Sequence, residues 1–441
     1  MSDELLALGE IVASTEIGEA PDSERQVLDQ GIRASLLCAL LGIEREPWVW
    51  EFPALAAKAT GATNSVVKML AGLFEPLGGV GHMATVAGAA DLDPMDPGPS
   101  HTVLPGTLAS CVAYGLTEGH DTSDGASDLA IGSGVRAGVE AAWCLRRAIS
   151  GTRPGVGFHS PGVFGAIAAA AAAARTLRLG AQECTNALAI ALTRASGLAI
   201  NSAASMIGMT HFGWGTAHGL EAALLASQGW DASRDVQRAL ASLFGEGRVD
   251  LDAITAKGPS AAGAMVFKRY PCNIYLNLLV AILDEVNDLP VDRIEIRMPW
   301  IPHLDCPAPR DIRQARNSAQ AVAAIAGAGD TSYAAFSGPR GPWMPTADVA
   351  RLLKNVDLSM DRSAPTRLNE AVVAARVWRG GSLVCNAERA VRDLGGWGIE
   401  HARKLMGTDD RNGGVEALYG ASYRTGFEHV QTRRRSVLGA N

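Results

Sequence analysis

The sequence lacks the short motifs that mark the best-known catalytic and nucleotide-binding proteins. It contains no GxxxxGK[ST] phosphate loop, no HExxH metalloprotease motif, no GxSxG nucleophile elbow, and no glycine fingerprint for a dinucleotide after a predicted strand. These absences exclude the common routes to nucleotide, zinc-protease and serine-hydrolase chemistry. We therefore expect any reaction to depend on ordinary side chains, without a cofactor.

Cysteine is scarce and scattered, and no segment has the composition of a membrane span. The seven cysteines are odd in number and form no CxxC pair, which argues against a disulfide framework and a zinc knuckle. Acidic residues stand near the N-terminus where a signal peptide would be basic. The longest stretch without Asp, Glu, Lys or Arg, residues 195–220, holds Asn201, His211, His218 and several glycines, which excludes a lipid-spanning helix. We expect a soluble cytoplasmic protein that does not bind membranes.

Positive charge is also in deficit. The chain has 39 Lys and Arg against 46 Asp and Glu, a net charge of −7, and its one basic block is the short TRRRS at 432–436. Such a chain offers no extended surface for nucleic acid, and an anionic substrate would need a local cluster of cations.

The order of predicted elements divides the chain into two domains, consistent with its 441 residues. Apolar spacing and end signals predict successive helices up to about residue 260, including 22–43, 64–74, 106–119, 132–149 and 181–198. Later, residues 291–300 alternate like a strand, and 370–388 predict two strands joined at Gly380-Gly381. The fold class predicted is mainly α: an all-helical domain over 1–264 and 395–441, with a smaller α+β lid domain over 265–394.

Three segments concentrate polar side chains that have alternative interpretations. A Pro/Gly-rich loop carries Asp91, Asp93, Asp96 and His101, which suit acid–base catalysis or metal binding but also suit a turn rich in capping side chains. His211 and His218 lie seven residues apart on one helical face, which favours a structural pair over a catalytic one. Lys268-Arg269 suits a clamp for a carboxylate at a domain junction, or a surface pair at a helix start.

A fourth segment places His159 where a loop gives way to an alanine-rich helix. A Ser-Pro-Gly turn follows His159, and an alanine tract typical of a helix follows the turn at once. Histidine exchanges a proton near neutral pH, and a helix N-terminus favours anions, so catalysis is one interpretation. A histidine that only packs and satisfies its own backbone is the other.

Taken in the order in which they occur along the chain, these segments resemble the MmgE/PrpD family, which includes 2-methylcitrate dehydratase, cis-aconitate decarboxylase and iminodisuccinate epimerase. The resemblance runs from about residue 5 to 430, and its clearest parts are residues 158–198, 211–233 and 267–273. By this resemblance His159 matches a family active-site histidine. Asp91, Asp93 and His101 match the acids and the later histidine of the family's "L-D-x-D-D" loop.

The resemblance implies a large helical domain with an α+β lid, a site between them, no cofactor and no metal, and a homodimer. It also implies removal of a proton beside a carboxylate, followed by loss of water or CO2 or by reprotonation. We expect a cofactor-independent, dehydratase-like lyase that acts on a small polycarboxylate or citrate-like substrate, in a specialised biosynthetic pathway. An isomerase (epimerase) or a decarboxylase is the runner-up. On this basis the catalytic residues are His159, His101 and Asp91, and the substrate-binding residues are Asp93, Lys268, Arg269, His211 and Asn277.

Three positions depart from the family pattern. Gly208 stands where the family often has lysine, Asn277 where it usually has histidine, and Ala321 where it has tyrosine. These losses indicate either a different substrate or a non-catalytic homologue that acts as a binding or scaffold subunit. Retention of Asp91, His101 and His159 favours an enzyme.

Overall fold

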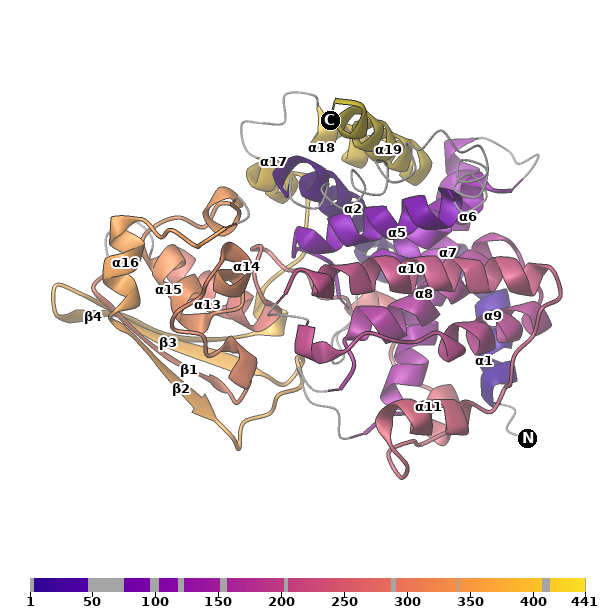
Figure 1. Ribbon diagram of the computed structural model, residues 1–441, viewed down its shortest axis with the longest axis horizontal. Helices are drawn as coiled ribbons and strands as arrows, with labels where there is room; N and C mark the ends of the chain where they lie inside the picture. Colours follow the sequence, from indigo (N-terminus) through magenta and orange to yellow (C-terminus); the bar gives the residue numbers. More distant parts are fainter. Residues whose placement is uncertain are drawn as a thin grey trace.

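The computed structural model describes residues 4–46, 75–95, 103–117, 123–150, 157–201, 205–286, 291–338, 341–406 and 413–440. Within these ranges the protein is mainly α-helical, with one four-stranded sheet (Figure 1). The predicted fold class, a helical body with a smaller α+β part, is therefore confirmed. The helix predicted over 64–74 lies outside the described residues.

The helical part contains the elements at both ends of the chain, and Figure 1 shows them packed together on one side of the molecule. Its first helices are α1 (Glu4–Ser14), α2 (Asp22–Arg45), α5 (Glu75–Ala89), α6 (Leu104–Gly115), α7 (Asp124–Arg147) and α8 (Ser160–Thr176). They are followed by α9 (Ala181–Thr193), α10 (Ile207–Ser227), α11 (Val236–Phe244) and α12 (Asp252–Thr255), and then, after the sheet, by α17 (Ile399–Met406), α18 (Gly414–Tyr419) and α19 (Tyr423–Ala440). The predicted return of the C-terminal segment to helix is confirmed.

The α+β part lies beside it and holds the sheet. Its elements are α13 (Ile274–Asp284), β1 (Arg293–Pro299), α14 (Ile312–Arg316), α15 (Ala319–Gly327), α16 (Ala347–Leu353), β2 (Val356–Asp361), β3 (Val372–Arg379) and β4 (Ser382–Ala390). The strand order is β2-β1-β3-β4, with β1 parallel to β2 and the other pairs antiparallel. Gly380 (φ 56°) and Gly381 (φ 79°) form the tight β3–β4 turn, whose two left-handed positions favour glycine. This hairpin was predicted from the sequence.

Close contact through glycine fixes the centre of the helical part. A Cβ atom on Gly213 of α10 would lie 2.3 Å from the Gly81 oxygen of α5, and one on Gly219 would lie 2.3 Å from the Ala166 oxygen of α8. Such distances exclude any side chain, so α10 packs backbone to backbone between α5 and α8. The start of α10 is thereby held against the start of α8.

Two hydrophobic clusters match the two parts of the chain. One joins the N-terminal helices with Trp397 and α17–α19, and the other joins α13, α15 and α16 with the sheet. The domain boundaries at 264/265 and 394/395 remain a prediction.

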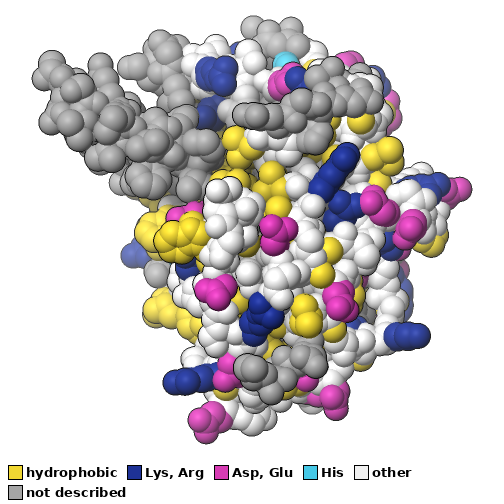
Figure 2. All heavy atoms as spheres, turned by 90° about the vertical axis from the view of Figure 1, so that its right-hand side faces the viewer, with side chains coloured by type: hydrophobic (Ala, Val, Ile, Leu, Met, Phe, Trp, Pro, Cys, Tyr) yellow, Lys and Arg dark blue, Asp and Glu magenta, His cyan; other side chains and the backbone are white. Residues whose placement is uncertain are grey.

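The helix α2 is the one described helix that is long and apolar enough to cross a membrane, and most of its apolar window is buried inside the protein. It packs as a core helix of a soluble protein does. On the face shown in Figure 2, acidic and basic side chains are interspersed with small apolar patches.

Candidate active site

Backbone pairing fixes His159 at the entry to α8. The His159 N–H donates to the Gly197 oxygen (2.8 Å), the Ala199 N–H donates to the Gly157 oxygen (2.8 Å), and Phe158 and Leu198 form a β-bridge. His159 is the residue before the helix, with extended backbone angles (φ −79°, ψ 123°), and its side chain does not cap the helix. The imidazole is thus free to point elsewhere.

The ring of His159 meets the ring of His211. Their Nδ1 atoms are 2.9 Å apart, a hydrogen-bond distance, although the residues are 52 positions apart in the sequence. Burial, with smaller effects from His211 and Lys268, lowers the pKa of His159 to about 3. Burial also lowers the pKa of His211. Both rings are therefore neutral near pH 7 and available to accept or donate a proton without first losing a charge.

A glycine holds the ring of His211 in place. Gly197 has a left-handed backbone (φ +100°), and a Cβ atom there would lie 3.0 Å from Cγ of His211. His218, about two turns further along α10, takes no part in this pair, because its ring instead packs edge-on to Trp214. The prediction of a structural His211–His218 pair is wrong: seven-residue spacing puts two side chains on one face, but His211 finds its partner on α8.

The acidic loop and the Lys268 segment meet through a short antiparallel bridge. Met95 and Val266 exchange backbone hydrogen bonds of 2.9 and 2.7 Å. In this register Asp93 lies opposite Lys268, as cross-strand neighbours two residues beyond the bridge do. Lys268 Nζ donates to Asp93 (2.8 Å) and to Asp91 (2.6 Å).

These three charges are buried as a group. The side chains of Lys268, Asp91 and Asp93 are 8%, 20% and 5% exposed. Burial alone would lower the pKa of Lys268, but the two carboxylates raise it far above the usual value for lysine, so the ammonium stays charged. Asp91 follows the end of α5 in a left-handed conformation (φ 55°), which aspartate tolerates better than most residues. The group carries a net charge of −1.

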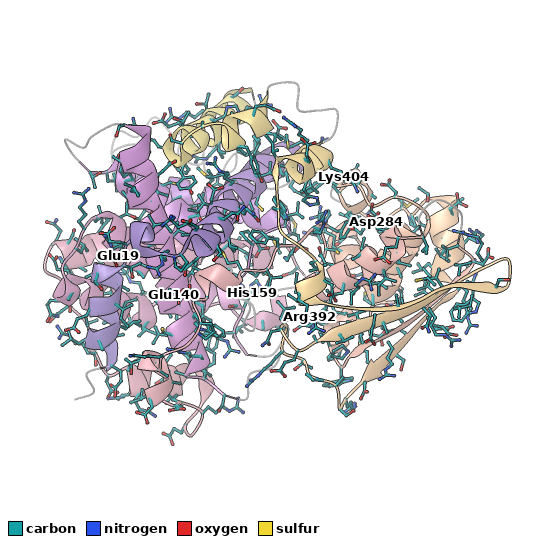
Figure 3. The ribbon with its side chains drawn as sticks, turned by 180° about the vertical axis from the view of Figure 1, so that it is seen from behind. Glu19, Glu140, His159, Asp284, Arg392 and Lys404 are labelled. Carbon is teal, nitrogen blue, oxygen red and sulfur yellow. The ribbon has the colours of Figure 1, made fainter. Side chains whose placement is uncertain are left out.

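The predicted site residues form two bonded groups in the structure. His159 pairs with His211, and Lys268 pairs with Asp91 and Asp93. The positive charge of Lys268 contributes to the low pKa of His159, so the two groups interact electrostatically. Figure 3 shows the labelled His159 in the helical part, on the side toward the α+β part. That the two groups form one site remains a prediction. His101 lies outside the described residues.

Arg269 does not join Lys268. Its guanidinium donates to the Leu394 oxygen (3.3 Å), whereas the backbone oxygen of Lys268 accepts from Trp397 Nε1 (2.8 Å). Successive side chains of an extended segment point in opposite directions, which turns Arg269 away from the acidic loop. The clamp predicted from the adjacent cations is therefore not formed.

Asn277 has a structural role in place of the predicted contact with substrate. The side chain is fully buried, and its oxygen accepts from the N–H groups of Arg269 (2.7 Å) and Tyr270 (2.9 Å). Its amide N–H groups donate to the Tyr270 and Cys272 oxygens (both 3.1 Å). Every polar atom of the amide is used to shape the loop after Lys268, so none is left for a ligand.

A second buried ion pair adjoins the acidic loop and has no sequence signal. Arg316 of α14 bonds to Glu46, 270 residues away, and donates to the Ala89 oxygen (2.9 Å) just before Asp91. Tyr333 also donates to Glu46 (3.1 Å). This cluster joins the end of α5 to the α+β part. Because Glu46 and Arg316 are far apart in the sequence, no sequence pattern predicted this ion pair.

The thiols beside the acidic loop are also buried. Burial raises the pKa of Cys38 and of Cys272 well above the usual value, with Asp93 and Asp91 respectively adding to the rise. Both thiols stay protonated at neutral pH and are poor nucleophiles. Among the described residues, no group of three or more His, Cys, Asp or Glu is placed to hold a metal ion.

Comparison with known sequences assigns the family. Residues 6–243, more than half of the chain, match the profile described as the MmgE/PrpD N-terminal domain. The chain belongs to the MmgE/PrpD family. Cis-aconitate decarboxylase of Homo sapiens is 31% identical over 185 residues, 38% of this chain and 38% of that protein. The Mus musculus cis-aconitate decarboxylase is 30% identical over 184 residues, 38% of this chain and 37% of that protein. The matched region is thus less than half the length of these relatives.

The three positions at which this MmgE/PrpD chain departs from the family pattern are all buried. Gly208 lies in the first turn of α10, and Ala321 lies in α15 within a small cluster with Ile312 and Ala315. The side-chain amide of Asn277 makes all its hydrogen bonds with the loop after Lys268. None of these three positions adds a charge to the histidine–lysine site.

Proposed function

We propose that this chain is a lyase that removes a proton beside a carboxylate of a small acid, in a dehydratase-like reaction without a cofactor. The observation that supports this most directly is the neutral His159–His211 pair beside a buried, charged lysine. A general base must be unprotonated before it acts, and the lowered pKa of His159 keeps its imidazole neutral at neutral pH. Because a low pKa also makes a weak base, the reaction depends on a cation that stabilises the developing negative charge.

In this proposal each group has a defined part. One imidazole takes the proton from the carbon next to the substrate carboxylate. Negative charge then develops on that carboxylate, and the Lys268 ammonium, whose charge acts on His159, is the proposed cation to offset it. The Lys268 hydrogen bond engages Oδ1 of Asp91, so its second oxygen can orient a hydroxyl or a water at the partly exposed edge of the group.

The substrate is proposed to carry few carboxylates. Lys268 is shared by two aspartates, Arg316 is sealed against Glu46, and Arg269 points away. The described part of the site is therefore less cationic than a tricarboxylate needs. A citrate-like acid in which an alkyl group replaces some of the charge fits this better, in keeping with a specialised biosynthetic role.

Other reactions share the first step. The matched relatives are named decarboxylases, and loss of CO2 or return of the proton to the other face would use the same base. A non-catalytic scaffold is the alternative favoured by the absence of a cation at 208 and of a phenol at 321. A cytoplasmic location and a homodimer stay predictions from the sequence.

The test is turnover of defined acids in D2O, followed by NMR. Citramalate, in which a methyl group replaces one carboxymethyl group of citrate, is incubated with the protein alongside citrate, 2-methylcitrate and cis-aconitate. Loss of water, loss of CO2 and deuterium uptake without other change are scored separately. Replacing His159 by Gln should lower the rate by roughly 10²–10⁴, the usual contribution of a positioned acid or base. His218→Gln, on the same helix but outside the pair, is the matched control and should keep its rate.

The outcomes distinguish the proposed dehydratase from the other reactions and from a scaffold. Water loss supports the dehydratase, whereas CO2 loss or deuterium uptake alone replaces it by the decarboxylase or the epimerase. Binding of these acids without any change to them favours the scaffold. A His159→Gln protein with full turnover removes His159 from the mechanism.

A further inference from the structure

Two neutral histidines that share a hydrogen bond through Nδ1 must hold different tautomers. With 2.9 Å between the Nδ1 atoms, one nitrogen carries the hydrogen and the other accepts it. The ring that donates has its second nitrogen, Nε2, bare and basic. The ring that accepts has its hydrogen on Nε2. The pair therefore presents one base and one acid at the same time.

The outer nitrogens of the pair have no hydrogen-bond partner among the described residues. The hydrogen bond that the structure gives to the two rings is the inner one between the Nδ1 atoms. The rings are tilted by 59°, with centroids 5.1 Å apart. A relay needs an inner bond of this kind between the rings and an outer nitrogen on each ring to exchange a proton with the substrate.

We propose that His159 and His211 act as one proton relay that moves a proton from the substrate carbon to its leaving hydroxyl. This inference rests on the lyase function proposed above. It adds His211, which that proposal gave no step of its own, as the second catalytic group. The sequence reading gave His211 a binding role.

The step balances in atoms and charge. The bare Nε2 takes the proton from carbon, and the hydrogen on the Nδ1 of the same ring crosses to the Nδ1 of the other ring. That second ring gives its Nε2 hydrogen to the hydroxyl, the C–O bond breaks, and water leaves as the C=C bond forms. Both rings end neutral with their tautomers exchanged. The start is restored when the first ring gives its Nε2 proton to solvent, the inner hydrogen crosses back, and the second ring takes a proton from solvent at Nε2.

The scaffold keeps the inner bond short. His159 is fixed by its backbone bond to Gly197, and the same Gly197 packs against the ring of His211. The backbone contacts of Gly215 and Gly219 with α8 prevent the two helices from separating without loss of packing. Lys268 is the one charged group named above that acts on His159, and its positive charge disfavours a doubly protonated pair.

The first experiment reads the tautomers and needs no substrate. The full-length protein labelled with ¹⁵N-histidine is studied by NMR at pH 7, and the two rings are assigned from the spectra of His159→Gln and His211→Gln. We expect one ring protonated at Nδ1 and the other at Nε2. Two rings in the same tautomer, or a cationic ring, would overturn the relay while leaving the lyase proposal standing.

The second experiment separates transfer from structural support. Asn at position 211 keeps an amide near the place of Nδ1 and can still bond to His159, but it cannot pass a proton on. We expect His211→Asn to lose roughly 10²–10⁴ in kcat with little change in KM. Retention of kcat by His211→Asn would reduce His211 to a positioning residue and overturn the relay.

A double variant supplies the control. Because the two rings act as one unit, His159→Gln combined with His211→Asn should lose no more rate than either single change. Losses that multiply would show two independent roles and contradict the relay. If the wild-type protein turns over none of the acids, the lyase proposal fails first, whatever the tautomers show.

Discussion

The histidine pair and the lysine group both withdraw ionisable side chains from water, but with opposite results. His159 and His211 are buried beside a neutral partner. The protonated form of each ring is therefore disfavoured, and the pKa of each falls. At Lys268 burial is met by two carboxylates, so the charge persists. Burial alone therefore does not decide whether a group is charged; the charge of the nearest partner does.

The histidine pair and the lysine group also differ in the contacts that hold them together. The histidines are brought together by helices that touch through glycine, whereas the lysine group is aligned by one β-bridge between two irregular segments. The histidine pair and the lysine group are thus held by different contacts. A mutation can disrupt either group without directly disrupting the other.

The largest effect is expected from Lys268→Met. This change leaves Asp91 and Asp93 buried together without a counter-charge, and removal of one member of a buried ion pair typically costs 3–5 kcal/mol. The free energy of unfolding, measured by urea denaturation, should fall by about this amount.

Arg269→Met is the matched control for that measurement. Arg269 neighbours Lys268 but makes one long hydrogen bond to a backbone oxygen, so we expect a loss of less than about 1 kcal/mol. If Lys268→Met does not fold, adding Asp91→Asn and Asp93→Asn should restore folding, since no charge is then left unpaired. Equal losses for the two single variants would show that the group does not act through charge.

The histidine side of the comparison predicts a loss of stability in acid. The pKa of His159 is about 3 when folded and about 6.5 when unfolded, so the unfolded chain binds more protons between these values. Stability is therefore full above pH 6.5 and declines as the pH falls toward 3. Between pH 7 and pH 5 the contribution of His159 to the decline is about 2 kcal/mol.

Denaturation of wild type and His159→Gln at both pH values isolates that contribution. The variant should lose about 2 kcal/mol less than wild type over this range. His401, whose pKa is lowered to about 4 chiefly by burial, adds to the decline with the same sign, so His401→Gln should also flatten it. Identical slopes for wild type and His159→Gln would mean that His159 is not kept neutral by the fold.

The smallest of the three effects is expected from Gly197→Ala. A side chain is strained at φ +100°, and the added Cβ would press on the ring of His211. We expect a loss of about 1–2 kcal/mol in stability and, because the ring is displaced, a larger fall in turnover. Gly125→Ala, where nothing lies within 4 Å, should be neutral or slightly stabilising. Full activity of Gly197→Ala would show that the ring is not held by this contact.

Local signals in the sequence were enough for much of the fold. The alanine tract after the Ser-Pro-Gly turn predicted a helix directly behind His159, and Gly380-Gly381 predicted the hairpin turn, since both depend on preferences within a few residues. The resemblance placed His159, Asp91 and Lys268 in one site; the structure shows Lys268 bonded to Asp91, and the joining of this pair with His159 in one site stays a prediction.

What could not be predicted depends on packing between distant segments. The partner of His211 is chosen by the approach of α10 to α8, and the Glu46–Arg316 pair by the docking of α14 near the end of α5. The direction of Arg269 and the bonds of Asn277 follow from the path of a single irregular loop. A sequence pattern states which residues are present but not which of them use up one another's hydrogen-bonding capacity.

The glycine contacts of α10 have a consequence for how this protein can diversify. Where backbone touches backbone, as at Gly213, Gly215 and Gly219, no side chain is present whose size could be varied. These three glycines cannot be replaced without loss of packing, so the spacing of the two imidazoles is also expected to stay fixed during evolution. New substrate preferences are then expected to arise by substitution in the α+β part, which can evolve while the inherited proton chemistry stays constant.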